Sequence, residues 1–425
     1  SRVCQFMSGP AFVVVYYLPQ LKYVSRTIGH TKGVRFMLAV LSTPRKLLRK
    51  AAVIAGIMGL SACDPSMMAA PGGGSGPNIN TNAPVPVALL IPRSDTGAGG
   101  LAASLENAAR LALASLDGVQ IDLRVYDTGG DAQRAAVQAE TAVAEGAQII
   151  LGPLFGEATN AAGVAVADNG INVLSFSNNP SIAGGNVFIL GPTFRNTANR
   201  LLGYSSRQGR NSVVIVHPQN VEGEFGKAAI QTAASQNGVR VAGIESFPFS
   251  QEGVTSAIPR IRSRIESTGA DSVFLTSNTA GALPMLLQLM PEGGVNPATT
   301  QYLGLARWDV PTQILSMPGA QGGYFTLADT ASKSAFDSRY RAQFGKDPHP
   351  LAGLAFDGIA AIGALVRQGR SDALSARALT QNSGFQGANG VFRIRPDGTN
   401  ERGLAIATVR NNQVTILDPA PSGFG

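Results

Sequence analysis

The sequence predicts an α/β protein in which parallel strands form doubly wound sheets, arranged as two lobes. Short β-branched runs alternate with amphipathic helical stretches, which indicates βαβ units and sheets covered by helices on both faces. Right-handed crossovers between parallel strands then give doubly wound sheets. The alternation continues for more units than one sheet comfortably holds. About 340 residues follow residue 84, enough for two domains with large cores.

Six runs rich in aliphatic and β-branched residues predict strands, over residues 87–91, 147–151, 173–174, 212–216, 239–241 and 272–275. Helices are expected over residues 101–115 and 132–145. In the second of these, Ala135, Ala139 and Ala142 form a small-residue face, whereas Gln133 and Arg134 face solvent. We find no short-period internal repeat.

The segment before these elements is typical of an export signal. A basic run at residues 45–50 precedes an apolar stretch at 51–60, two small residues and Cys63. Ten apolar residues are too few to cross about 30 Å of hydrocarbon as a helix. The ending Leu60-Ser61-Ala62-Cys63 resembles a bacterial lipobox, which implies that Cys63 is lipidated and becomes the mature N-terminus. The alternative is an ordinary cleavage site with an incidental cysteine.

These features divide the N-terminal region into three parts. Met37 is a plausible start, so residues 1–36 are expected to be an over-extended N-terminus and residues 37–62 a lipoprotein signal peptide. Residues 63–84 are expected to be the lipidated cysteine and a flexible tether, because glycine, proline and small polar residues bury little apolar surface. The protein is therefore expected in the periplasm of a Gram-negative bacterium, attached by its lipid to the outer or inner membrane.

The charge distribution gives no indication of nucleic-acid binding. Residues 1–63 contain nine Lys/Arg and no Asp/Glu, which leaves 25 basic and 27 acidic residues in 64–425, a formal charge of −2. The basic character of the chain thus belongs to its leader. The two cysteines, Cys4 and Cys63, leave no pair for a disulfide in the body.

No catalytic, metal or cofactor motif stands out. The three histidines are His30, His217 and His349, and no His/Cys/acid cluster has metal-ligand spacing. A G-x-S-x-G elbow is absent. Residues 223–228 lack the length of a phosphate loop and the Ser/Thr after its lysine. We therefore expect a non-enzymatic protein without a cofactor or metal.

Polar loops follow the predicted strands, where open parallel sheets bind their ligands. These loops span residues 92–95, 152–156, 175–179, 217–220 and 276–279. Their hydroxyls, amides and glycines suit a small polar ligand. The candidate cleft residues among them are Arg93, Ser94, Phe155, Gly156, Ser175, Ser177, Asn178 and Asn278. The alternative is that the polar residues cap the following helices and that Phe155 packs in the core.

Five widely spaced segments resemble type I periplasmic binding proteins, especially the branched-chain amino-acid receptors. They span residues 87–92, 126–131, 145–154, 336–358 and 390–398, the last as a terminal hairpin. The resemblance covers nearly all of residues 85–425. It implies two discontinuous lobes, 85–196 with 328–385 and 197–327 with 386–425, that close on a ligand.

In amino-acid receptors of this family, hydroxyls and backbone N–H groups hold the ligand carboxylate, a carboxylate holds the ammonium and an aromatic residue flanks the cleft. By this resemblance Phe225, Trp308 and Asp309 join the candidates, although Phe225 and Trp308 could equally be core or rim residues. Gly156 stands where the family has serine, and Phe225 replaces its tyrosine. No clear ammonium-binding acid appears near Trp308, and Asp309 is the one candidate.

Residues 402–407 and 418–421 resemble a second branch of the fold, the lipid-anchored penicillin-binding protein activators. We therefore favour a protein that activates a peptidoglycan synthase, a bifunctional penicillin-binding protein, as its partner. The alternative is the substrate-binding protein of an ABC importer for amino acids or a related small polar solute; a wall fragment is another candidate ligand. Asp64 resembles an inner-membrane retention signal, whereas the activators sit in the outer membrane, so both membranes stay open.

Overall fold

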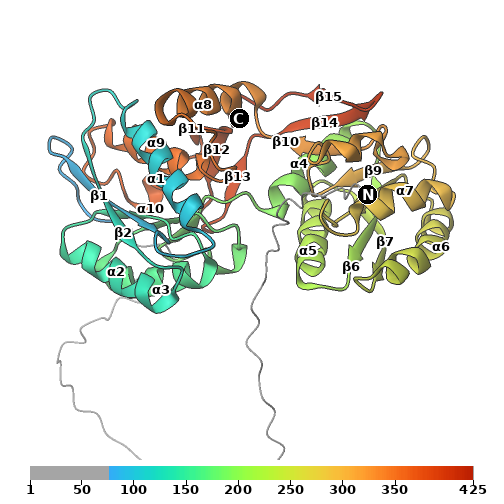
Figure 1. The fold of residues 1–425 in the computed structure, drawn as a ribbon, viewed down its shortest axis with the longest axis horizontal. Coiled ribbons are helices and arrows are strands. Elements are labelled where there is room, and N and C mark those ends of the chain that lie inside the picture. The colour runs from blue at the N-terminus through green and yellow to red at the C-terminus, as the bar shows by residue number, and fades with distance from the viewer. Residues whose placement is uncertain (1–75, 425) are drawn as a thin grey trace, which may run out of the picture. The chain divides into compact units, whose positions relative to one another are not determined.

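The computed structural model describes residues 76–424, and their α/β architecture confirms the predicted fold class (Figure 1). The first 75 residues, including the expected leader and Cys63, lie outside the described residues. The flexible tether was predicted to extend to residue 84, but this prediction is wrong for the part that contains Ile79. Ile79 is buried in a hydrophobic core, and its N–H donates to the carbonyl of Ser371 at 2.8 Å. The packed body thus begins before the first strand.

The strands are β1 (Val85–Ile91), β2 (Ile121–Asp127), β3 (Ile149–Leu151), β4 (Val173–Ser175), β5 (Val187–Ile189), β6 (Ser212–Pro218), β7 (Arg240–Phe247), β8 (Ser272–Leu275), β9 (Gln301–Gly304), β10 (Tyr324–Leu327), β11 (Phe385–Gly387), β12 (Gly390–Ile394), β13 (Asn400–Arg402), β14 (Ala405–Arg410) and β15 (Gln413–Asp418). All six strands that the sequence predicts are present.

The α-helices are α1 (Gly99–Leu113), α2 (Ala132–Ala144), α3 (Gly156–Val166), α4 (Phe194–Arg207), α5 (Val221–Gln236), α6 (Gln251–Thr268), α7 (Leu283–Glu292), α8 (Thr330–Phe344), α9 (Gly353–Val366) and α10 (Ala376–Leu379). Helices α1 and α2 confirm the two that the sequence predicts. Among the helices of the described residues, none has both the length and the apolar character needed to cross a membrane.

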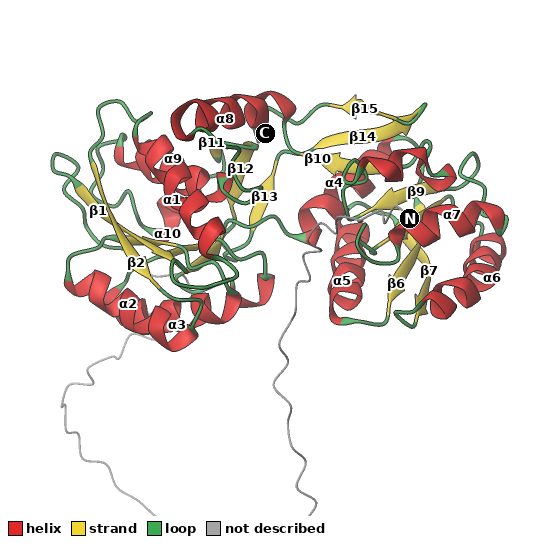
Figure 2. Cartoon of the chain, viewed as in Figure 1, coloured by secondary structure: helices red, strands yellow, loops and turns green. Residues whose placement is uncertain are grey.

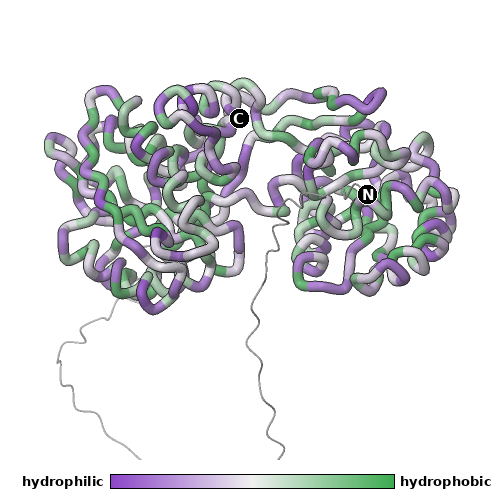
Figure 3. The backbone as a smooth tube through the Cα atoms, in the orientation of Figure 1, coloured by the Kyte–Doolittle hydropathy of each residue, from purple (hydrophilic) through white to green (hydrophobic). Residues whose placement is uncertain are grey.

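The first sheet is fully parallel, in the order β2-β1-β3-β4-β5. Successive side chains of β1 alternate between its two faces. Leu89 packs in a core with α1 and α9, whereas Leu90 packs on the other face with α2 and α3. Helices therefore cover both faces (Figure 2), and the apolar stretches of chain coincide largely with the strands (Figure 3).

The second sheet has the order β15-β14-β10-β9-β8-β6-β7. Its strands β6 to β10 are parallel, and β6 again alternates: Val214 packs with α6 and α7, and Val213 packs with α4 and α5. Unlike the purely parallel prediction, β14 and β15 form an antiparallel edge. They are joined by Asn411 and Asn412, both with positive φ, the conformation of a tight hairpin turn.

A small antiparallel sheet, β11-β12-β13, contains the expected terminal hairpin of β12 and β13. Its Phe385, Phe392 and Ile394 are buried in the same core as α1 and α9. The two-lobe division stays a proposal, and within it we assign residues 386–402 to the first lobe rather than the second. The reason is that Phe392 and Ile394 bury their side chains against the first core.

Two chain segments that join the cores lie side by side. The Asn400 amide donates to the carbonyls of Ile189 at 2.9 Å and Gly191 at 2.8 Å, and its oxygen accepts from Asn196 at 2.9 Å. These bonds are buried, so they tie the strand β13 to the segment between β5 and α4. Because buried amides and carbonyls must be paired, this contact is strongly specified.

A buried ion pair continues this junction. Arg402 Nη1 lies 2.8 Å from Asp357 Oδ2 on α9, and its guanidinium also donates to the carbonyl of Leu190 and lies over the Phe392 ring. Asp357 is fully buried and accepts the Ala388 N–H at 2.7 Å. Burial raises the pKa of Asp357, while Arg402 and the Ala388 N–H oppose that rise. The carboxylate is thus stable in its charged form only with its partner in place.

We predict that Arg402→Met lowers the free energy of unfolding by about 3–5 kcal/mol, because it leaves the Asp357 carboxylate buried and unpaired. Urea denaturation measures this. The double variant Asp357→Asn/Arg402→Met removes the charge and keeps an acceptor for Ala388, so it should recover at least half of the loss. As a control, Arg370→Gln breaks an exposed pair with Asp372 and should cost less than about 1 kcal/mol. Equal losses in the Arg402 and Arg370 variants would contradict this role.

Candidate functional site

Polar loops lie at the carboxyl ends of the parallel strands in both sheets, as the sequence predicts. In the first sheet they follow β1, β3 and β4. In the second they follow β6, β8 and β9, which are neighbours or next-neighbours in the strand order.

The loop after β1 is stabilised by its own charges. Arg93 is exposed and pairs with Glu106 at 3.2 Å. The Ser94 N–H donates to Asp127 Oδ1 at 3.1 Å, and Arg134 donates to the Ser94 hydroxyl and to Asp127 Oδ2. Burial alone would raise the pKa of Asp127, but hydrogen bonds from Ser94 and Gly129 and the charge of Arg134 lower it to about 2. Asp127 thus holds the loop in place.

The loops after β3 and β4 come together at the start of α3. A Cβ atom placed on Gly156 would lie 3.5 Å from the Asn179 amide nitrogen and 3.7 Å from the Ser177 hydroxyl. Ser177 is buried and accepts the Asn179 N–H at 3.2 Å. Phe155 is 40% exposed and Asn178 is exposed. Gly156 and Ser177, selected separately from the sequence, therefore share one polar corner.

Ser175 is not available to a ligand, which corrects its selection from the sequence. It is fully buried, and its hydroxyl contacts Thr159 Oγ1 at 2.7 Å and the Pro153 carbonyl at 3.1 Å. It also accepts the Ser177 N–H at 3.0 Å. One donor and two acceptor positions are all that a serine hydroxyl has, so the loop itself uses them all.

Trp308 is a core residue, which corrects its selection for the cleft. It is fully buried and stacks on Phe325 with ring centroids 5.9 Å apart. A Cβ atom on Gly304 or Gly323 would collide with the indole. Because the two glycines have no side chains, they leave the space that the indole fills.

The other candidates of the second sheet remain at the surface. Phe225, on α5, is 51% exposed. Asp309 is already paired: its Oδ1 accepts from Arg307 Nε at 2.9 Å, and this hydrogen bond raises the pKa of Arg307. The sequence identified the carboxylate and missed the guanidinium beside it, although Arg307 follows the same strand.

A cavity of about 390 Å³ contains this Arg307–Asp309 pair. The residues that line it come from the loop after β9, from β10, from the first turns of α8 and α9 and from the segment after β13. They are Pro192, Thr197, Leu305, Arg307, Asp309, Thr326, Leu327, Ala328, Thr330, Lys333, Pro350, Leu351, Leu354, Asn389, Arg402 and Leu404. Leucine side chains beside ionic groups suit a small molecule with an apolar and a charged end.

Three consecutive residues after β8 have polar atoms without partners. Thr276 Oγ1, Ser277 Oγ and Asn278 Oδ1 are buried, and no hydrogen bond reaches them within residues 76–424. Thr276 and Ser277 are only 3% and 4% exposed. An unpaired buried polar group costs about 1–3 kcal/mol, so natural proteins rarely collect three of them without a use. From the sequence, only Asn278 was selected. The signal that could have identified Thr276 and Ser277 as well is that all three residues directly follow a predicted strand.

A carboxylate lies beside these atoms. The Asn278 amide nitrogen donates to both oxygens of Glu222, at 3.0 Å each. Glu222 is exposed in the first turn of α5, where the helix dipole favours an acid. The three residues after β8, Asn220, Glu222 and Phe249 line one shallow hollow. Sequence reasoning missed Glu222, which is a second candidate for holding a cation. In the part of the chain that the structure describes, no group of His, Cys, Asp and Glu is placed to hold a metal ion.

The model of a family described as periplasmic binding protein matches residues 84–413. The chain belongs to the periplasmic binding protein family. Membership implies a periplasmic location, and the members are solute-binding proteins rather than enzymes. The match spans all the loops described above. No curated protein matches this periplasmic binding protein.

Solved structures support the same fold. A protein from Rhodospirillum rubrum, named for branched-chain amino acid ABC transport, is 19% identical over 79% of this chain and 100% of its own, with a TM-score of 0.66. An ABC transporter substrate-binding protein from Desulfitobacterium hafniense in complex with Leu is 15% identical over 79% and 100%, with a TM-score of 0.55. An R. palustris solute-binding protein in complex with benzoate is 17% identical over 80% and 98%, with a TM-score of 0.50.

We predict that Asp127→Asn lowers the free energy of unfolding by about 1–2 kcal/mol at pH 7. The folded pKa of Asp127 is about 2, below its usual 3.8. Its contribution is therefore complete above the unfolded pKa and is lost as the pH falls through the folded pKa. Urea denaturation of both proteins should show a difference that is constant above about pH 5 and shrinks towards pH 2. A difference that does not change with pH would contradict this assignment.

Proposed function

We propose that this protein is the substrate-binding protein of an ABC importer for amino acids or a related small polar solute. The observation that carries the proposal is the row of unpaired buried polar atoms on Thr276, Ser277 and Asn278. A ligand that hydrogen-bonds these atoms would recover the free energy that their burial costs.

A separate cavity, lined by Leu305 and Arg307 after the adjacent strand β9, supports a small solute. Its volume of about 390 Å³ lies in the range of pockets for small molecules. Arg307 and Lys333 line it as cations, each already paired with an acid, Asp309 and Asp337, and their remaining N–H donors suit a ligand carboxylate. Leu305, Leu351 and Leu354 supply an apolar wall. This combination suits a carboxylate that carries an aliphatic or aromatic group.

Two ligand classes follow from these charges. The D. hafniense protein is in complex with Leu and the R. palustris protein with benzoate, so one fold accommodates a carboxylate with or without an ammonium group. Here Glu222 and Asp309 are the acids available for an ammonium group. We propose Glu222 for this role, because Asp309 already pairs with Arg307.

The comparisons favour the importer hypothesis over the activator hypothesis drawn from the sequence ending. The matching family and the three solved structures concern solute binding and ABC transport, and none of their names refers to a peptidoglycan synthase. The two hypotheses differ in one assay: an activator raises the turnover of a bifunctional penicillin-binding protein, whereas an importer receptor leaves it unchanged and binds a solute.

We predict that Thr276→Val weakens the binding of the cognate solute about tenfold, by removing a hydrogen bond that only the ligand makes. The ligand would first be found by calorimetry with a panel of amino acids and benzoates. The ligand-free variant should be at least as stable as the wild type, because valine removes an unpaired buried hydroxyl and keeps the methyl group that packs near Gly226.

Thr408→Val is the matched control. Thr408 is also buried with an unpaired hydroxyl, but it lies within β14 and away from the strand-end loops. Its replacement should leave the affinity unchanged. A tenfold loss in both variants, or in neither, would contradict a ligand site after β8. If no solute in the panel binds and a synthase is stimulated, the importer proposal is wrong.

We also propose that Cys63 is lipidated and anchors the protein to a membrane, as the lipobox-like sequence indicates. We predict that Cys63→Ala moves the protein from the membrane fraction to the soluble fraction, because the lipid acceptor is lost. Cell fractionation with an antibody measures this, with Ser66→Ala in the expected tether as the control. A variant that stays in the membrane fraction would overturn the anchor.

A further inference from the structure

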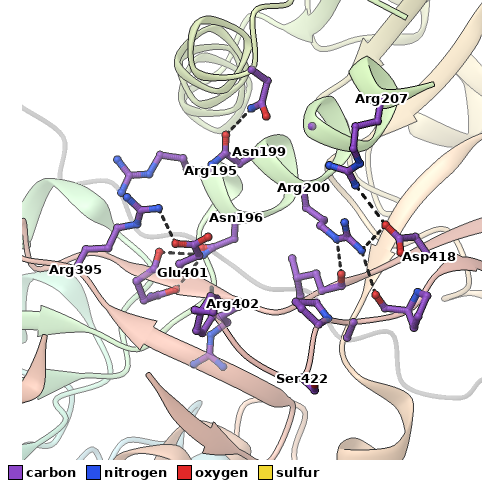
Figure 4. A pocket seen from close by; sticks show the side chains of 18 residues that line it. Arg195, Asn196, Asn199, Arg200, Arg207, Arg395, Glu401, Arg402, Asp418 and Ser422 are labelled. Carbon is purple, nitrogen blue, oxygen red and sulfur yellow. Dashed lines mark hydrogen bonds and ion pairs between the residues drawn. The ribbon is translucent and has the colours of Figure 1, made fainter. Parts of the chain in front are cut away.

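An arginine-rich cavity lies away from the strand-end loops and is not explained by solute binding. Its volume is about 600 Å³, and α4, β13 and the chain from Asp418 to Phe424 form its wall. Figure 4 shows Arg195, Arg200 and Arg207 projecting from one helix, with Arg395, Glu401 and Asp418 across from them. Segments about 200 residues apart in the chain thus bring their arginines to one place.

The ion pairs around this cavity leave positive charge in excess. Glu401 Oε2 is shared by Arg393 at 2.8 Å and Arg395 at 2.7 Å. Asp418 Oδ2 is shared by Arg200 at 3.0 Å and Arg207 at 3.4 Å. Each group contains two guanidinium ions and one carboxylate, so each retains one positive charge.

The remaining charges near the cavity cancel. Arg195 lies 3.4 Å from Asp397, and Arg402 pairs with the buried Asp357. Six arginines and four acids are thus counted, which leaves two positive charges without a partner among these groups. Five of the arginines and two of the acids, Glu401 and Asp418, line the cavity itself. Two unmatched charges on one concave wall attract an anion more strongly than they would on a flat surface, because the protein excludes part of the screening solvent.

The wall is also rigid before any ligand arrives. Arg200 is only 19% exposed, and its guanidinium donates to the carbonyls of Leu404 at 2.6 Å and Pro419 at 3.1 Å. The Asn237 amide donates to Asn199 at 2.8 Å in the same wall. An anion would meet groups that are already oriented, so little side-chain entropy is lost on binding.

We infer that this cavity is a second binding site, for a small doubly charged anion such as phosphate or a dicarboxylate. The contacts come from the most exposed cationic member of one of the two charged groups, either Arg207 beside Asp418 or Arg395 beside Glu401, and Arg200 holds the wall between these two positions. Guanidinium groups bind phosphate and carboxylate through paired N–H donors. The inference does not depend on the solute bound after β8.

Occupation of this site acts on the junction of the two cores. Arg402 and Leu404 line both this cavity and the one of about 390 Å³. An anion here contacts the same crossing segment from its other side. It should therefore raise the stability of the whole body, not only that of a surface loop.

Calorimetry and thermal unfolding of the purified protein test the site, with inorganic phosphate at pH 8 and with malonate as the dicarboxylate. Sodium chloride at equal ionic strength is the reference, so that general screening cancels. We expect saturable binding of at least one dianion and a higher Tm than in chloride. Binding of phosphate alone or of malonate alone identifies the charged group that the site accepts, and either result supports the site. Equal Tm in all three salts, with no heat of binding, overturns it.

Variants locate the binding. Either Arg207→Gln or Arg395→Gln, at the position that the anion occupies, should weaken dianion affinity about tenfold, because it removes a charge-assisted contact, and no loss in either variant overturns the site. Both side chains are partly exposed, so the variants should fold. Arg370→Gln is the matched control: it is 56% exposed and paired with an aspartate, as Arg207 is 59% exposed and paired with Asp418. Losses of equal size in all three variants would assign the binding to net charge and overturn the site.

Discussion

The buried pair of Arg402 and Asp357 is the interaction on which the arrangement of this chain depends. It joins β13, α9 and the carbonyl of Leu190, three segments separated by tens to hundreds of residues. An ion pair without water stabilises only when both partners are present and fully hydrogen-bonded. Asn400 completes the junction by bonding the carbonyls of Ile189 and Gly191. Each sheet can form its own core, but this polar junction specifies how the chain passes between them.

The strand-end loops use polar groups in two different ways. In the first sheet the hydroxyl of Ser175 and the carboxylate of Asp127 are consumed by internal bonds that shape the loops. In the second sheet Thr276 and Ser277 are equally buried and are bonded to nothing in the described part of the chain. This contrast separates residues that build a loop from residues that we propose to bind a ligand. Residue type alone does not make that distinction.

Sequence patterns predicted the strands, the first two helices and the polar edges, because hydrophobic periodicity and loop composition are local properties. They did not predict the roles of single residues at those edges. Trp308 was chosen as the only tryptophan, next to a strand-end loop. It is buried because Gly304, at the end of β9, and Gly323, just before β10, leave room for an indole. Glu222 was missed because its partner Asn278 is 56 residues away.

Local sequence patterns alone predicted the α/β class and the positions of the loops that carry polar side chains. These features follow from local periodicity, which depends on residues close together in the sequence. The tertiary structure alone decided which polar groups are satisfied, where Trp308 lies and how six arginines meet four acids around one cavity. Those properties depend on pairs of residues far apart in the chain, and hydrogen bonding and charge compensation act only between atoms that folding has brought together.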